Sequence, residues 1–530
     1  MSLSSITFFS HPLFPTLLPS LLSTLVSLRS ISIRCTDSSN SGGKLLLQSD
    51  LDIASSSLDL HLHDLQLLLP LLFKPTGSRG ESDLDEANAI VLSHPTPSSS
   101  KEDVSLFVRD LFARLVIGDA ELKKKALDSL LRLLLECGSI AANLFVEEVD
   151  INCLIHLLDS NNQSSAIREL AVASIAALAS TSEVSRKVIF EEGVLGPLLR
   201  LLDSGSTVSR EHSADAIATI TSDPNNAWAV AAYGGIAVLI DACRSSTGGS
   251  TETRKKASSS LRNVVVASVG GDTKEAMVEE GAIPVLLEML GDSDTTIQKN
   301  SAHCLWILAS SGESFRVLIL KQGALSKILQ LFHSCDNPEL MEHVLRPLHV
   351  LSSSISAAKT LSGSLVFLSR LADLIGQHHC QHLAASLLFN LSISDDAKRL
   401  MAGCMGALVK MMMELPKPAG SHVIAARVLV SLLSIRSNRK ELSKDAKSMT
   451  RLVQMLNPKS NDGLSKNLPV SVVLALAEDR GGCRKRIVAA GACQHLQKLV
   501  ELDVSGAKRA LQRISGGRFK NLFSSITWRE

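Results

Sequence analysis

The sequence predicts an all-α repeat solenoid, and three observations lead to that prediction. Aromatic residues make up only 3% of the 530 residues, whereas Leu, Ala and Ser dominate, a composition that favours helices over strands. A break, usually a glycine, recurs every 40 to 47 residues, and a usually small residue recurs at a similar interval about 21 residues later. Between these positions the apolar residues follow helical spacing. Because one such unit cannot bury its apolar face alone, we expect the units to stack.

The first predicted domain is helical and covers residues 1–73. Its leucines recur at three- and four-residue spacing, as on one face of an amphipathic helix: Leu18, Leu21, Leu22, Leu25 and Leu28. The many serines and two arginines before the first acidic residue, Asp37, fit an alternative in which residues 1–35 belong to a plastid transit peptide. Both interpretations stay open. Residues 74–104, rich in Pro, Ser and Gly, are predicted to be a flexible linker.

About nine predicted repeats occupy residues 105–515. Each is expected to hold a short helix, a corner, a second helix, a turn and a longer third helix. The corner positions are Val149, Gly193, Gly234, Gly281, Gly323, Gly363, Gly403, Lys447 and Gly491. Glycine allows a backbone angle there that other residues resist, so two helices can meet almost at a right angle. The usually small positions of the third helices, which allow close helix approach, are Ala126, Ala171, Ser213, Ala257, Ser301, Val344, Ala384 and Ala425.

Two stretches resemble the armadillo repeat family. They are "EEGAIPVLLEML" from Glu279, followed by "QKNSAHCLWILASS", and "CQHLAASLLFNLSIS" with its A-x-x-x-L-x-N-L core. The resemblance covers nearly four fifths of the chain and implies a right-handed superhelical solenoid. Within the family the chain is similar to plant proteins related to U-box ligases and to vacuolar armadillo proteins. HEAT repeats are the second choice, since they lack the glycine corner and the asparagine.

Composition and motifs do not indicate an enzyme. The net charge of +1 shows no bulk preference for nucleic acid. The ten cysteines form no C-x-x-C pair, and no nucleophile-elbow, zincin or Walker pattern appears. A U-box needs a C-P-I-containing segment that is absent here, so direct ubiquitin-ligase activity is not expected. We therefore expect no catalytic, cofactor-binding or metal-binding residues. No uncharged apolar run reaches the roughly 18 residues of a bilayer span, so no transmembrane segment is expected.

The predicted function is a non-enzymatic protein–protein interaction scaffold or adaptor that binds a partner protein along the concave groove. The alternative is a non-catalytic subunit of a ubiquitin-ligase complex. Importin α grips basic peptides with a ladder of Trp and Asn, but only Asn263 and Asn390 hold the Asn position here. The family resemblance implies that these asparagines contact the backbone of an extended peptide; capping of local turns is the alternative. The candidate partner-binding residues are Asn263, Asn390, Thr219, Ser431, Arg427 and His303.

Basic residues gather in several places along the chain. Residues 516–530 are predicted to be a basic C-terminal tail, and a weak contact of this tail with an acidic surface is expected. Clusters at Lys123–Lys125, Arg254–Lys256 and Arg484–Arg486 would favour acidic partners if they faced the groove. We expect a cytoplasmic protein, with the nucleus also open and the plastid as the alternative.

Overall fold

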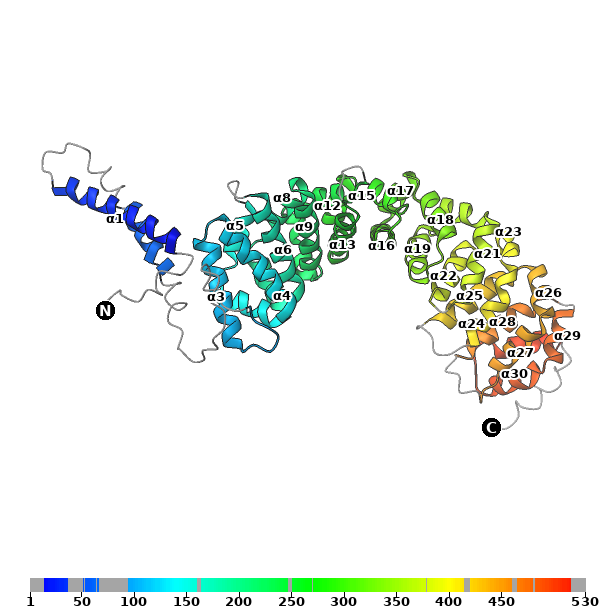
Figure 1. Cartoon of the computed structure of the whole chain (residues 1–530). Helices are drawn as coiled ribbons and strands as arrows, with labels where there is room; N and C mark the ends of the chain where they lie inside the picture. Colours follow the sequence, from blue (N-terminus) through cyan, green and yellow to red (C-terminus); the bar gives the residue numbers. More distant parts are fainter. Residues whose placement is uncertain are drawn as a thin grey trace. The chain divides into compact units, whose positions relative to one another are not determined.

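The computed structural model describes residues 14–36, 51, 53–62, 64–65, 94–159, 164–245, 250–268, 270–377, 379–413, 420–459, 465–479 and 482–515. These residues form helices and turns, with no strand among them, so the predicted all-α class is confirmed. The chain divides into two compact units, Met1–Glu280 (unit 1) and Gly281–Glu530 (unit 2) (Figure 1). Most of the predicted linker and the predicted basic tail lie outside the described residues. The boundaries at 73, 104 and 515 stay predictions.

The N-terminal part of unit 1 is a long helix, α1 (Phe14–Thr36), that packs against the helical residues 53–62. Thr24 Oγ1 lies 3.0 Å from His61 Nε2. The covered side of α1 is the line Leu17, Leu21, Thr24, Leu28 and Ile31. The predicted apolar face is therefore corrected: Leu18, Leu22 and Leu25 are exposed, because the stripe containing Leu17 is the one that meets the neighbouring helices.

The rest of unit 1 is built from twelve described helices. They are α3 (Lys101–Ile117), α4 (Ala120–Glu148), α5 (Asn152–Asp159), α6 (Ser165–Thr181), α7 (Glu183–Glu191), α8 (Leu195–Ser204), α9 (Thr207–Ile220), α10 (Pro224–Ala227), α11 (Ala229–Ala232), α12 (Gly235–Cys243), α13 (Thr251–Ala267) and α14 (Asp272–Glu279). The third helices of the repeats are α4, α6, α9 and α13, and each packs against the next. Helix α3 begins at Lys101, inside the predicted linker, where Ser100 caps its first turn.

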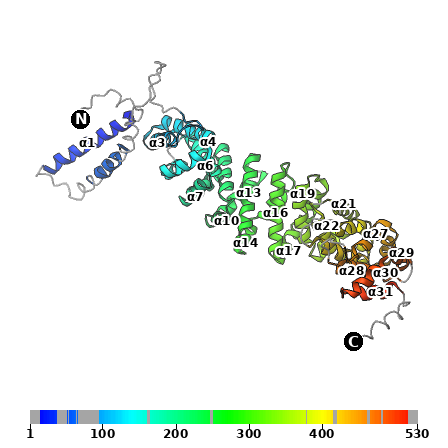
Figure 2. The same cartoon turned by 90° about the horizontal axis from the view of Figure 1, so that it is seen from below.

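Unit 2 continues the same three-helix pattern. Its described elements are α15 (Ala282–Met289), α16 (Thr295–Ser311), α17 (Glu313–Lys321), α18 (Ala324–Ser334), α19 (Pro338–Leu351), α20 (Ile355–Ser362), α21 (Leu365–Leu374), α22 (Gln381–Leu391), α23 (Asp395–Leu400), η2 (Ala402–Cys404), α24 (Met405–Met413), α25 (Ser421–Leu432), α26 (Arg436–Lys444), α27 (Ala446–Met455), α28 (Asn467–Leu476), α29 (Gly482–Ala489), α30 (Ala492–Glu501) and α31 (Ala507–Ile514). The third helices α16, α19, α22, α25, α28 and α31 pack in sequence order. Figure 2 labels α16, α19 and α22 side by side.

Glycine corners join most first and second helices. A left-handed backbone, with φ from +68° to +91°, occurs at five predicted corners: Gly193, Gly234, Gly281, Gly323 and Gly491. Two other glycine corners need correction, and the two non-glycine corners are not left-handed either: Val149 is extended and Lys447 lies inside α27. Gly363 has a φ of −81°, because the side chain of Ser364 caps the next helix instead. Gly403 lies inside the short helix η2.

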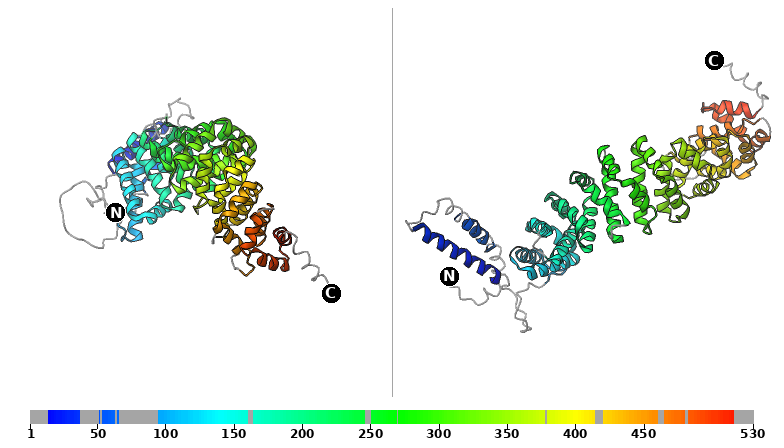
Figure 3. Two further views of the ribbon diagram at one scale, coloured as in Figure 1. Left: turned by 90° about the vertical axis from the view of Figure 1, so that its right-hand side faces the viewer. Right: turned by 90° about the horizontal axis from the view of Figure 1, so that it is seen from above.

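The buried core runs through the third helices within each unit, whose helices stack without intervening strands in the described residues (Figure 3). All eight usually small positions are buried. Serine, aspartate and asparagine side chains start these helices by accepting a backbone N–H bond, as Ser206 does from Ser209 and Asp294 from Thr296. Capped starts and small buried positions together fix which side of each third helix faces the neighbouring repeats.

Candidate functional site

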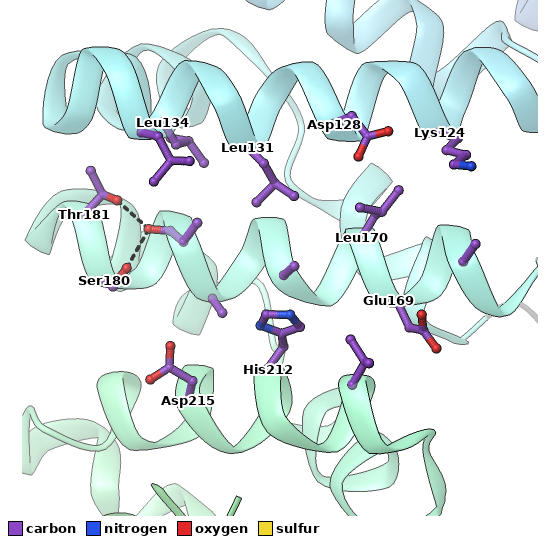
Figure 4. A pocket seen from close by; sticks show the side chains of 16 residues that line it. Lys124, Asp128, Leu131, Leu134, Glu169, Leu170, Ser180, Thr181, His212 and Asp215 are labelled. Atoms are coloured by element: carbon purple, nitrogen blue, oxygen red, sulfur yellow. Dashed lines mark hydrogen bonds between the residues drawn. The ribbon is translucent and has the colours of Figure 1, made fainter. Parts of the chain in front are cut away.

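An open groove of about 640 Å³ crosses three consecutive third helices of unit 1 (Figure 4). Helix α4 contributes leucines to its walls, including Leu131 and Leu134, whereas α6 contributes alanines such as Ala173 and Ala177. The short alanine side chains leave a hollow between the bulkier side chains of α4 and α9. Leu135, at the edge of the groove, is 87% exposed. An uncovered apolar surface of this kind marks a candidate protein-binding site.

Three carboxylates line this groove against one lysine and one histidine. Asp215 pairs with Lys256 at 2.5 Å, so one of the predicted basic clusters neutralises it. Glu169 accepts hydrogen bonds from Ser165 and Ser206. Asp128 makes no ion pair with any described residue and lies on α4, on the side that faces Leu170 of α6 (Figure 4). The groove therefore combines apolar contacts with excess negative charge.

Two of the predicted partner-binding residues connect neighbouring repeats. The Asn263 side-chain amide donates to the carbonyl of Ala218 and to Thr221 Oγ1, both at 3.3 Å. The Asn390 amide donates to the carbonyl of His349 at 3.3 Å and to Ser352 Oγ at 2.9 Å. These are equivalent positions, so each asparagine joins a third helix to the end of the preceding one.

The other predicted residues also lie on third helices. Ser431 Oγ donates to Ser392 Oγ at 3.0 Å, which repeats the connection made by the asparagines. The guanidinium of Arg427 lies 4.2 Å from the centroid of the Phe389 ring. His303 lies 5.2 Å from Trp306 and 5.7 Å from His343, measured between ring centroids. Thr219 is half-buried on α9.

None of the six predicted residues lines the groove of Figure 4, although Asn390 lines a second groove of about 750 Å³ in unit 2. Their role in partner binding stays a prediction.

The sequence does contain a signal for the groove of Figure 4. Leu135 stands nine positions after Ala126, at a position where two other repeats carry Val266 and Ile393 and five carry serine: Ser180, Ser222, Ser310, Ser353 and Ser434.

Burial keeps three of the described thiols protonated. Burial raises the pKa of Cys153 and of Cys404 to about 12, and that of Cys380 to about 11, so these thiols stay protonated near neutral pH. Within the described residues, no three His, Cys, Asp or Glu side chains form a group that could hold a metal ion. The stretch Gln377–His382 includes residue 378, which lies outside that description.

Two described helices are long and apolar enough to cross a membrane, judged by length and composition alone, although the sequence analysis expects none. They are Pro15–Ile33 and Ala120–Glu148; a bent pair, Pro224–Ala232 with Gly235–Cys243, would make a third. Helix α4 is broken at Gly138, where φ is 53°, and buries nine side chains within unit 1. Its apolar character is therefore explained by the core of the repeats.

Two family models match the chain. Residues 272–310 match the model described as Armadillo/beta-catenin-like repeat, and residues 1–71 match one described as Domain of unknown function (DUF7032). The first match begins with α14 and ends in α16, and so contains one complete three-helix repeat.

Similar proteins include two from Arabidopsis thaliana. Protein CELLULOSE SYNTHASE INTERACTIVE 2 is 25% identical over 250 residues, which cover 45% of this chain and 11% of that protein. Protein CELLULOSE SYNTHASE INTERACTIVE 3 is 26% identical over 293 residues, which cover 52% of this chain and 14% of that protein. This chain thus spans only a small part of the length of these relatives.

The crystal structure of an engineered protein is similar to the chain with a TM-score of 0.63 and 26% identity, over 77% of this chain and 98% of that one. The relation to U-box proteins stays a prediction. The matched repeat, the recurring three-helix pattern and the likeness to this structure agree that the chain contains an armadillo repeat and folds as an armadillo-repeat solenoid.

Proposed function

We propose that the protein is a non-enzymatic scaffold that binds a segment of a partner protein along the groove of α4, α6 and α9. The observation that carries this proposal is the open apolar hollow across three consecutive third helices. A repeat array presents such surfaces along its length, and binding needs no further element to complete the site. The armadillo fold supports the same conclusion.

The groove defines the chemistry of the segment that would fit it. Apolar side chains of the partner would cover Leu131 and Leu135, and full burial of one leucine side chain contributes about 1.5–3 kcal/mol. A lysine or arginine of the partner would meet Asp128, which forms no ion pair with a described residue although Lys124 stands one helical turn before it. The proposed partner segment is thus apolar with a basic residue close by.

The printed names of the two Arabidopsis relatives suggest one partner for direct testing. Those proteins are called cellulose synthase interactive, so we propose cellulose synthase as one candidate partner of this chain. A reducing compartment such as the cytoplasm is also proposed, with the nucleus or plastid as alternatives. The absence of disulfides among the nine described cysteines supports it.

The proposal is tested by filling the groove. The full chain is prepared with Ala173→Arg and Ala177→Arg, two half-buried positions of the groove. The matched control is Val184→Arg on α7, which is 52% exposed and outside the groove. We expect partners captured from plant extract, cellulose synthase among those examined, to be lost with the groove variant and retained with the control. Equal capture by both variants would contradict the proposal, provided that both melt like the wild type.

A further inference from the structure

Unit 2 contains the same arginine–aromatic stack twice. Arg346 of α19 lies 4.7 Å from the centroid of Trp306 on α16, and Arg427 of α25 lies 4.2 Å from that of Phe389 on α22. Each aromatic residue stands five positions after the usually small residue of its own helix, and each arginine two positions after that of the next third helix. The repeat register therefore builds one geometry at two places.

These positions correspond to those that line the groove in unit 1. There, Asp128 and Asp215 stand two positions after the usually small residue, and Leu131 stands five positions after it. We call this side of the third helices the third-helix face. Unit 2 thus carries arginines where unit 1 carries carboxylates.

Positive charge slightly exceeds negative charge on the third-helix face of unit 2, where three Lys or Arg residues stand against two carboxylates. The charged and titratable residues around it on α16, α19, α22 and α25, and just before α22, are Lys299, His303, Glu339, Glu342, His343, Arg346, His349, His379, His382 and Arg427. Both carboxylates are already paired: Glu342 with Arg346 at 2.6 Å and Glu339 with Lys299 at 2.5 Å. Arg427 is exposed and has no ion pair with any described residue. The face therefore retains positive charge.

We propose that the third-helix face of unit 2 binds an acidic segment of a partner protein, with carboxylates at Arg346 and Arg427. The inference rests on the proposed function, in which the third-helix face is the binding surface. The N–H groups of Arg427 form no ion pair with a described residue, and Arg346 donates one Nη2–H to Glu342 and keeps further N–H donors for a second carboxylate. Because each guanidinium lies over a ring, less side-chain freedom is lost on binding. The carboxamide oxygen of Asn390, beside Phe389, adds an acceptor for a backbone N–H of the segment.

Histidines give this interaction a pH dependence. Burial lowers the pKa of His349 and of His382, and the nearby His382 lowers that of His349 further. Both imidazoles are therefore neutral near pH 7. A bound carboxylate favours their protonated forms, so binding takes up protons. The affinity for an acidic segment should accordingly rise as the pH falls from 7.5 to about 6.

The test uses the full chain and a fluorescein-labelled peptide of alternating glutamate and serine, with a lysine–serine peptide for comparison. We expect saturable anisotropy with the glutamate peptide, and tighter binding at pH 6 than at pH 7.5. Arg346→Gln with Arg427→Gln should weaken binding by about tenfold or more. The control, Lys321→Gln with Lys485→Gln, removes two exposed cations of the same unit from α17 and α29, which are not third helices, and should change it less than about twofold.

The fluorescence of Trp306 reports whether the peptide binds at the third-helix face of unit 2. With Trp228→Phe and Trp528→Phe, Trp306 is the only tryptophan, and its emission should change on binding of the glutamate peptide. No saturable binding, or an equal loss in the control variant, would overturn the inference. If the Ala173→Arg, Ala177→Arg variant still captures every partner while the glutamate peptide binds as expected, the proposed function of the unit 1 groove is wrong and the inference for unit 2 is retained. If groove capture is lost as expected but the peptide does not bind, only this inference fails.

Discussion

Replacing Asn390 with alanine tests whether the asparagines of the third helices connect repeats. The change removes two hydrogen bonds at the end of α19, one to the carbonyl of the half-buried His349 and one to Oγ of the buried Ser352. A net hydrogen bond contributes about 0.5–1.5 kcal/mol, so the free energy of unfolding should fall by about 1–2 kcal/mol. Because the bonds cross from α22 to α19, the loss should appear in unit 2.

The assay is urea denaturation, with hydrogen exchange of the α22 amides to locate the weakened region. Asn225→Ala, on an exposed side chain of α10, is the matched control and should change stability by less than about 0.5 kcal/mol. A double-mutant cycle with Ser352→Ala should show a coupling of about 0.5–1 kcal/mol. An unchanged unfolding free energy together with lost partner binding would refute the bridging role and leave Asn390 as a partner-binding residue.

Three further predictions follow from the repeat geometry. Leu286→Asp places a charge at a position that is 0% exposed, and should destabilise the protein by several kcal/mol, about the cost of an unpaired buried charge; a wild-type melting curve would show that the repeat register is wrong. Gly323→Ala forces alanine to a φ of 81° and should cost about 1–2 kcal/mol. Gly363→Ala, at a φ of −81°, is its control and should be close to neutral; equal losses in urea midpoint would contradict this reasoning. Native protein at pH 7.5 should leave Cys404 unmodified by iodoacetamide, since burial raises the pKa of this thiol to about 12. Rapid labelling of Cys404, detected by peptide mass, would show that this part of unit 2 opens.

The repeat pattern is the feature that sequence predicts best. A left-handed glycine such as Gly323 and a buried small residue such as Ser301 are both required by local geometry, so they remain visible in one sequence. Gly363 and Gly403 show the limit of the glycine signal. At these corners a serine cap or a short helical turn replaces the left-handed residue.

The candidate groove was harder to predict because it depends on contacts between repeats. Leucine stripes on α1 look alike in sequence, and only packing shows that Leu17 is covered while Leu22 is 63% exposed.

The hydrogen bonds of Asn263 and Asn390 between repeats can be recognised in the sequence. Thr221 and Ser352 provide hydroxyls eight positions after the small residue of the repeat before Asn263 and Asn390, respectively. Each pair is thus visible in the sequence as an asparagine six positions after one small residue and a hydroxyl eight positions after the preceding one.

The central claim, that the third-helix face of unit 1 binds a partner segment, is tested most directly by site-specific photo-crosslinking. A photoreactive phenylalanine replaces Leu135, at the edge of the groove, or Val184, outside it, in otherwise identical full chains. We predict a crosslinked partner from position 135, reduced by Ala173→Arg, and none from position 184. Crosslinking only from position 184, or crosslinking from position 135 that Ala173→Arg does not reduce, would contradict the claim.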